Sequence, residues 1–215
     1  MKKIITTKKK EDATRFHVVI FGSARLKPDD PVYRKVYDLA KRLAAKGMDV
    51  VTGGGPGLME ASNKGCQEGR KNLDVRSYGI NVKLLKPQTT NQHLDIKKEF
   101  NRFSQRLDYF MYLADAIVVA PGGIGTMLEL MYTWQLIQVQ DIIHVPIILL
   151  GDGYAALLKW FKKNPLKNSL VSPEDFRMIH VARDNKEAMN IILTRYQYFL
   201  TQKKRPKTHY AKYKI

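Results

Sequence analysis

Residues 118–135 read VVAPGGIGTMLELMYTWQ and combine three features that together indicate the fold. The apolar run before Pro121 is typical of a strand that is covered on both faces. The glycines that follow let the backbone approach a ligand closely, and a helical pattern with one acid, Glu129, comes next. Strand, loop and helix in this order form the repeating unit of parallel α/β sheets, so the stretch predicts that architecture.

The same alternation continues along the rest of the chain. Apolar strands are predicted at 16–22, 48–55, 75–82, 116–120 and 145–151, with a short edge strand at 177–182. Helices are predicted at 31–47, 57–70, 99–115, 125–139, 154–164 and 184–202, and 83–95 is predicted to be a loop. The pattern is typical of a doubly wound, mostly parallel α/β sheet with helices on both faces, a Rossmann-like and nucleotide-binding arrangement. We expect one such domain over 16–202.

Composition places the chain among globular proteins, with 44% hydrophobic and 27% charged residues in 215. The longest apolar run, 142–150, is far shorter than the ~20 residues that a membrane span requires. The N-terminus is basic but lacks the apolar region of a secretory signal. A single cysteine, Cys66, excludes an internal disulfide framework and fits a reducing compartment. We therefore expect a cytoplasmic protein with no membrane partner.

Most of the net charge of +17 lies at the two ends of the chain. Residues 1–17 carry six Lys or Arg against two acids, and residues 199–215 carry six and no acid. We interpret 1–15 as a basic N-terminal extension and 203–215 as a basic C-terminal tail, both of them solvated. The alternative is that these ends bind nucleic acid through its phosphates.

Three of the predicted strands end in glycine-rich loops. These loops are FGSAR (21–25), TGGGPGLME (52–60) and PGGIGTMLE (121–129). Ligands of parallel α/β sheets bind at the carboxyl ends of the strands, and the N-terminus of the following helix favours phosphate. We therefore expect the loops to meet and to bind a phosphorylated substrate through Gly22, Ser23, Gly53, Gly54, Gly55, Gly57, Met59, Gly122, Gly123, Gly125 and Thr126.

The common nucleotide-binding signatures do not fit these loops. No Gly-Lys-Ser/Thr follows either of the two longer loops, which excludes a P-loop. Leu58 stands where the dinucleotide fingerprint requires glycine or alanine, and Thr52 ends the second strand in place of a ribose-binding acid. The loops therefore favour a mononucleotide. No cluster of His, Cys, Asp and Glu has the spacing of a metal site, so we expect neither a metal nor a cofactor.

The two longer loops resemble the paired motifs of the LOG (Lonely Guy) family of lysine-decarboxylase-like Rossmann proteins. The family motif PGGxGTxxE is matched at each fixed position, by Pro121, Gly122, Gly123, Gly125, Thr126 and Glu129. The resemblance extends from about Phe16 to Phe161. It implies a homodimeric nucleoside 5′-monophosphate phosphoribohydrolase, an enzyme class that includes cytokinin-activating members.

The resemblance also implies that Arg106, fifteen residues before the proline of the motif, is a functional residue. The family lysine after it is replaced by Leu107, and the usual Met-His ahead of it by Phe103 and Ser104. N-glycosidic cleavage passes through a positively charged sugar, which a carboxylate such as Glu129 can stabilise. We expect Arg106 and Glu129 to be the catalytic residues.

Two other functions remain open on the sequence. A catalytically silent nucleotide-binding or sensing protein would keep the glycine loops, and a nucleic-acid-binding module would use the basic ends. A pyridoxal-phosphate decarboxylase is disfavoured, because no lysine lies at a strand end facing the loops.

Overall fold

The structure is a computed structural model that describes residues 14–83, 85, 89–142 and 145–202. The predicted basic tail at 203–215 lies outside the described residues, and so does the predicted N-terminal extension apart from Thr14 and Arg15. The other predicted elements lie within the described part of the chain, apart from residues 84 and 86–88 of the predicted loop 83–95. Residues 143–144, just before the fifth predicted strand, are also outside the described part.

One seven-stranded sheet runs through the described structure, and every neighbouring pair of its strands is parallel. Its order is β4-β3-β2-β1-β5-β6-β7. The strands are β1 (His17–Phe21), β2 (Asp49–Thr52), β3 (Ser77–Val82), β4 (Ile96–Phe100), β5 (Ala116–Val119), β6 (Ile147–Leu150) and β7 (Ile179–Ala182). β1 lies between β2 and β5, so the winding direction reverses there, and ligands of such sheets bind at this crevice.

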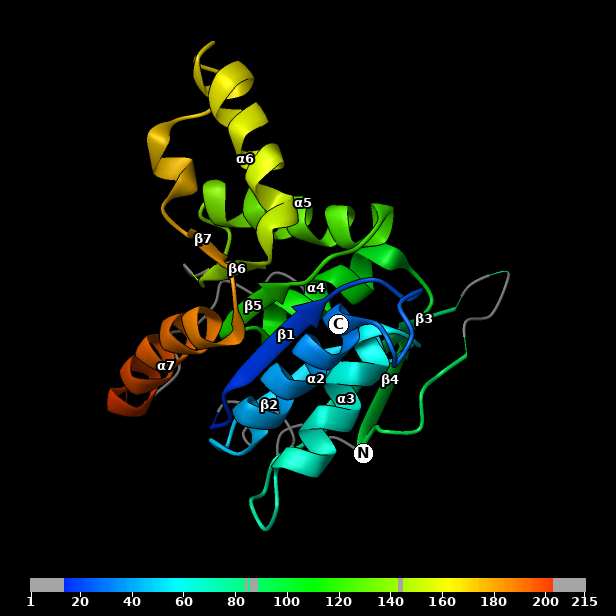
Figure 1. The fold of residues 1–215 in the computed structure, drawn as a ribbon. Helices are drawn as coiled ribbons and strands as arrows, with labels where there is room; N and C mark the ends of the chain where they lie inside the picture. The colour runs from blue at the N-terminus through cyan, green and yellow to red at the C-terminus, as the bar shows by residue number, and fades with distance from the viewer. Residues whose placement is uncertain (1–13, 84, 86–88, 143–144, 203–215) are drawn as a thin grey trace, which may run out of the picture.

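Helices cover both faces of the sheet (Figure 1). They are α2 (Pro31–Ala44), α3 (Leu58–Gly69), α4 (Phe103–Leu113), α5 (Ile124–Gln138), α6 (Ala155–Phe161) and α7 (Asn185–Thr201). Val18 and Ile20 of β1 belong to the core cluster shared with α2, α3 and α7. Val19 and Phe21 belong to the cluster shared with α4 and α5. Alternate residues of β1 thus face two different cores, which explains why apolar residues follow one another along this strand. Two cores, one on each face of the sheet, confirm the predicted doubly wound α/β fold.

The prediction of one helix over 99–115 was wrong at its start. Glu99 and Phe100 belong to the edge strand β4, and α4 begins only at Phe103. β4 has the sequence IKKEF, in which Lys97 and Glu99 are exposed because the strand has a neighbour on one side only. Such a half-exposed strand lacks the apolar run by which the other strands were recognised.

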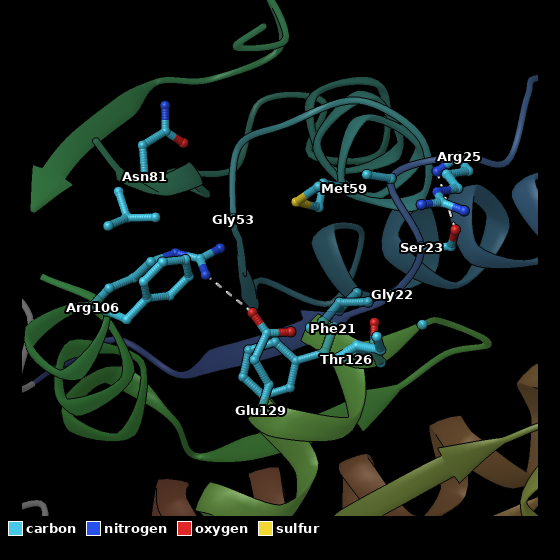
Figure 2. Close-up of a pocket in the computed structure, with 17 residues that line it drawn as sticks. Phe21, Gly22, Ser23, Arg25, Gly53, Met59, Asn81, Arg106, Thr126 and Glu129 are labelled. Carbon is cyan, nitrogen blue, oxygen red and sulfur yellow. Dashed lines mark hydrogen bonds and ion pairs between the residues drawn. The ribbon is translucent and has the colours of Figure 1, made fainter. Parts of the chain in front are cut away.

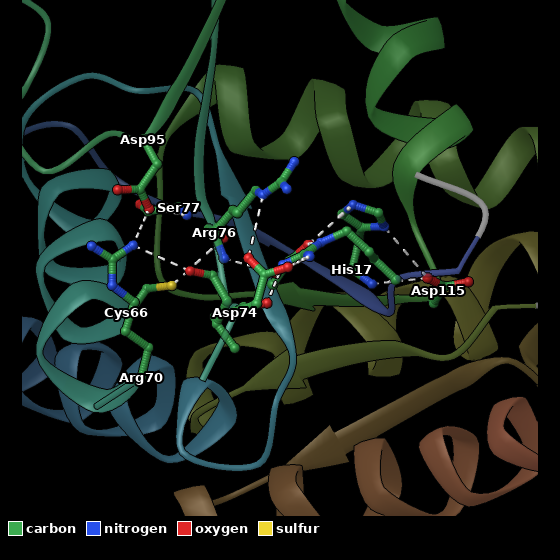
Figure 3. A network of polar contacts seen from close by, with 11 residues as sticks. His17, Cys66, Arg70, Asp74, Arg76, Ser77, Asp95 and Asp115 are labelled. Carbon is green, nitrogen blue, oxygen red and sulfur yellow. Dashed lines mark hydrogen bonds and ion pairs between the residues drawn. The ribbon is translucent and has the colours of Figure 1, made fainter. Parts of the chain in front are cut away.

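Charged and polar side chains tie the amino-terminal ends of the strands together (Figure 3). Buried Asp49 accepts hydrogen bonds from the side chain of Arg15 and from the backbone N–H of Arg76, the latter at 2.8 Å. Asp115 accepts one from the backbone N–H of His17, also at 2.8 Å. These contacts connect segments that begin β1, β2, β3 and β5. Arg15 neutralises the carboxylate of Asp49, and the backbone hydrogen bond stabilises that of Asp115. The candidate active site lies at the opposite ends of the strands, the carboxyl ends.

Candidate active site

A cavity of about 480 Å³ lies at the carboxyl ends of β1, β2, β3 and β5 (Figure 2). All three predicted glycine loops contribute to its wall, as the sequence predicted. Among the predicted binding residues, those that line it are Gly22, Ser23, Gly53, Met59, Gly123, Gly125 and Thr126. Both predicted catalytic residues, Arg106 and Glu129, line it as well. Segments that lie more than a hundred residues apart in the sequence thus line the same cavity.

The other predicted binding residues, Gly54, Gly55, Gly57 and Gly122, do not line this cavity. Gly57 has a φ of +69°, and a Cβ there would lie 2.5 Å from the carbonyl oxygen of Ser23. A Cβ at Gly122 would lie 2.1 Å from Oγ1 of Thr126. These two glycines let the loops pack against neighbouring atoms, which a side chain would prevent. Direct contact of the four glycines with substrate stays a prediction.

Arg106 and Glu129 form an ion pair inside the cavity (Figure 2). Nη1 of Arg106, from α4, lies 3.3 Å from Oε1 of Glu129, from the second turn of α5. The guanidinium also donates from Nε to the carbonyl oxygen of Ile80 at 2.7 Å, at the end of β3. Only 13% of the Arg106 side chain and 12% of the Glu129 side chain are exposed. The two side chains are therefore held in a fixed arrangement largely shielded from water.

Burial changes the protonation of this pair. Loss of hydration raises the pKa of Glu129 to about 7, although the nearby guanidinium of Arg106 works in the opposite direction. Burial likewise lowers the pKa of Arg106 from its ordinary value. A carboxyl group with a pKa near neutrality can accept and return a proton under physiological conditions, which is the property required of a general base.

Gly53 provides the space that the Arg106 guanidinium occupies. A Cβ at this position would lie 2.4 Å from Nη2 of Arg106 and 2.7 Å from Sδ of Met59. Both distances are shorter than any side chain tolerates, so an alanine would displace the guanidinium from its place beside Glu129. The first glycine of the GGGPG loop therefore positions Arg106, in addition to lining the cavity.

The N-terminus of α5 opens into the same cavity. Gly123 is the N-cap residue and has no side chain, so the described structure shows no side-chain cap on the first turn of the helix. Gly123, Ile124, Gly125 and Thr126 all line the cavity. Because the first N–H groups of a helix are unsatisfied within the helix, this 15-residue element presents donors and a partial positive charge to a ligand. The arrangement suits a phosphate group.

The predictions from the sequence did not include several residues of the cavity wall, among them Arg25, Asn81 and Phe103. Arg25 belongs to the FGSAR loop, and Asn81 lies near the carboxyl end of β3, so the rule that placed the glycine loops would also have found both. Phe103 lies at the start of α4 and is 49% exposed, and no strand-end rule points to it.

In the described part of the chain, no group of three or more His, Cys, Asp or Glu side chains is placed to hold a metal ion. None of the helices described there combines the length and the apolar character that crossing a membrane would require.

Known proteins share both the sequence pattern and the fold. The family model described as "Possible lysine decarboxylase" matches residues 59–192. The chain is 31% identical over 158 residues to a probable cytokinin riboside 5′-monophosphate phosphoribohydrolase, LOGL3, from Oryza sativa subsp. japonica, with 71% of this chain and 72% of that protein covered. It is 28% identical over 119 residues to the pyrimidine/purine nucleotide 5′-monophosphate nucleosidase of Escherichia coli K12, covering 54% of this chain and 26% of that longer protein.

Among solved structures, the X-ray structure of TM1055, a structural genomics target, superposes with a TM-score of 0.64 at 25% identity, covering 83% of this chain and 99% of that one. The matching family model spans most of the α/β domain and includes both Arg106 and Glu129. The chain therefore belongs to the LOG family of lysine-decarboxylase-like proteins.

Proposed function

We propose that the protein is a nucleoside 5′-monophosphate phosphoribohydrolase, which hydrolyses AMP or cytokinin riboside monophosphate-like nucleotides to free base and ribose 5-phosphate. The observation that carries the proposal is the buried Arg106–Glu129 pair in a cavity that the three glycine loops line. The names of the relatives from rice and Escherichia coli, a phosphoribohydrolase and a nucleosidase, support the same reaction class.

The N-terminus of α5 binds the 5′-phosphate in this proposal, with the ribose beside Glu129. The bond between C1′ and the base nitrogen breaks while water adds its oxygen to C1′. The carboxylate of Glu129 stabilises the positive charge that develops on the sugar and accepts the proton of the attacking water, and the departing base takes up a proton. Arg106 keeps Glu129 in place and lowers its pKa enough to leave a useful carboxylate fraction at neutral pH.

A panel of nucleoside monophosphates incubated with the full chain tests the proposal. We expect free base and ribose 5-phosphate in equal amounts from at least one nucleotide. Nucleotide binding without any base release would instead support the silent-binding alternative. A salt-dependent gel shift that requires residues 1–13 and 203–215 would support the nucleic-acid-binding alternative.

The pKa of Glu129 predicts how activity depends on pH. Because burial raises it to about 7, the carboxylate fraction grows as the pH rises through neutrality, so kcat/KM should increase with a midpoint near pH 7. The second ionisation of a phosphate monoester lies at about pH 6 and contributes its own titration. A pH profile for the parent and for the residual activity of Glu129→Gln separates the two. Persistence of the limb near pH 7 in the variant would contradict the assignment to Glu129.

We also propose that the protein is a cytoplasmic homodimer in which α4 and α5 form much of the contact. Large apolar side chains are exposed on these helices, namely Phe103, which is 49% exposed, Leu128 at 47% and Ile124 at 91%. Exposed apolar clusters of this kind commonly mark an interface. Light scattering should therefore give twice the chain mass of 24.7 kDa at micromolar concentration. A monomer mass would contradict the proposal, and Leu128→Glu should shift the dimer toward monomer.

A further inference from the structure

Among the described residues, three charged side chains line the cavity, and two of them neutralise each other. Glu129 and Arg106 form the buried ion pair described above, and Arg25 is the third. Within the described residues, no acidic side chain lies within ion-pair distance of Arg25, and its side chain is exposed. The guanidinium of Arg25 therefore has no acidic partner among the described residues, and its positive charge is available to a ligand.

The backbone fixes the place of Arg25 relative to the helix termini. The N–H of Ser23 donates to the carbonyl oxygen of Pro121 at 3.1 Å, which ties the loop after β1 to the loop before α5. The N–H of Leu58 donates to the carbonyl oxygen of Ser23 at 2.8 Å, which ties the same loop to the start of α3. The loop that carries Arg25 is thus anchored to the N-termini of two helices.

Ser23 and Arg25 also lie together within this loop. The backbone N–H of Arg25 donates to Oγ of Ser23 at 3.1 Å, and both residues line the cavity. Figure 2 shows them on the opposite side of the cavity from Arg106, with Thr126 and Glu129 between the two sides. The two arginines therefore lie on different sides of the cavity, and the loop before α5 is hydrogen-bonded to the loop that carries Arg25.

We propose that Arg25 binds the 5′-phosphate of the substrate and makes the site select phosphate monoesters over unphosphorylated nucleosides. The inference rests on the proposed function and adds the residue that recognises the phosphate. A phosphate monoester carries nearly two negative charges at pH 7, whereas a helix N-terminus supplies about half a positive charge. A guanidinium adds a full charge and can donate two parallel hydrogen bonds to phosphate oxygens. The exposure of Arg25 leaves its side chain free to turn toward the anion.

Calorimetric titration of the full chain with AMP, ribose 5-phosphate and adenosine tests the inference. Arg25→Gln should weaken the binding of AMP and of ribose 5-phosphate by about tenfold or more, as for the loss of hydrogen bonds between charged groups. Adenosine binding should not change, because it offers no phosphate. Arg25→Lys should restore part of the loss, since it keeps the charge but not the paired donors. Arg34→Gln, an exposed change on α2 outside the cavity, controls for the loss of one positive charge.

The outcomes separate this inference from the proposed function. Equal affinity of parent and Arg25→Gln for AMP and ribose 5-phosphate would overturn the role of Arg25, whether or not the parent releases base. An equal loss of affinity for adenosine would also overturn it, because that result indicates damage to the cavity rather than loss of a phosphate contact. If the parent binds AMP but releases no base, the hydrolytic function fails while the binding series still decides the role of Arg25.

Discussion

Replacing Glu129 with glutamine is expected to lower turnover by about 10²-fold or more, as for the loss of an acid–base or electrostatic group in other enzymes. The substitution keeps the shape of the side chain but removes the charge that stabilises the sugar and the group that accepts the proton. AMP binding should change little, because the proposed mode of binding places the phosphate at the N-terminus of α5 and not against Glu129. A base-release assay beside a calorimetric AMP titration measures the two effects separately.

Glu60 offers a matched control for this substitution. It also follows a glycine loop and lies in the first turn of its helix, α3, but it does not line the cavity. Glu60→Gln should therefore release base at the parental rate. Full base release by Glu129→Gln would remove the carboxylate from the mechanism, and the silent-binding alternative expects no base release from the parent either.

Replacing Gly123 with valine is expected to abolish AMP binding while leaving the fold intact. A Cβ at Gly123 would meet no atom of the described residues within 4 Å apart from its chain neighbours, and its φ of −99° is accessible to any residue, so a valine fits there. Its methyl groups would occupy the space in front of the first N–H groups of α5, where the proposed phosphate lies. Calorimetry should detect no heat of AMP binding, and circular dichroism should show the parental spectrum and melting temperature.

Gly153 provides the control for the size of the new side chain. A Cβ there also has no protein atom within 4 Å, but the residue lies outside the cavity, so Gly153→Val should bind AMP as the parent does. Gly57→Val is a contrasting case, because its φ of +69° and the nearby Ser23 backbone predict a damaged loop and a lower melting temperature. Parental AMP affinity of Gly123→Val would show that the phosphate lies elsewhere.

The sequence alone predicted the fold and the neighbourhood of the site. Strands covered on both faces are largely apolar, so β5 and β6 are visible as unbroken apolar runs, and β1 and β2 as shorter runs that begin after His17 and Asp49. Glycine loops at the ends of such strands meet at one edge whenever the sheet is parallel. This topological rule, together with the PGGxGTxxE motif, placed Glu129 at the site, and the resemblance to the LOG family added Arg106.

Only the tertiary structure decided the features that depend on distant neighbours. β4 escaped recognition because an edge strand needs no apolar run. The function of Gly53 became visible only with the Arg106 guanidinium packed against it. The pKa of Glu129 near 7 follows from burial, which outweighs the opposite effect of Arg106 on another helix. Burial and pairing across elements arise from packing, and local sequence pattern does not encode them.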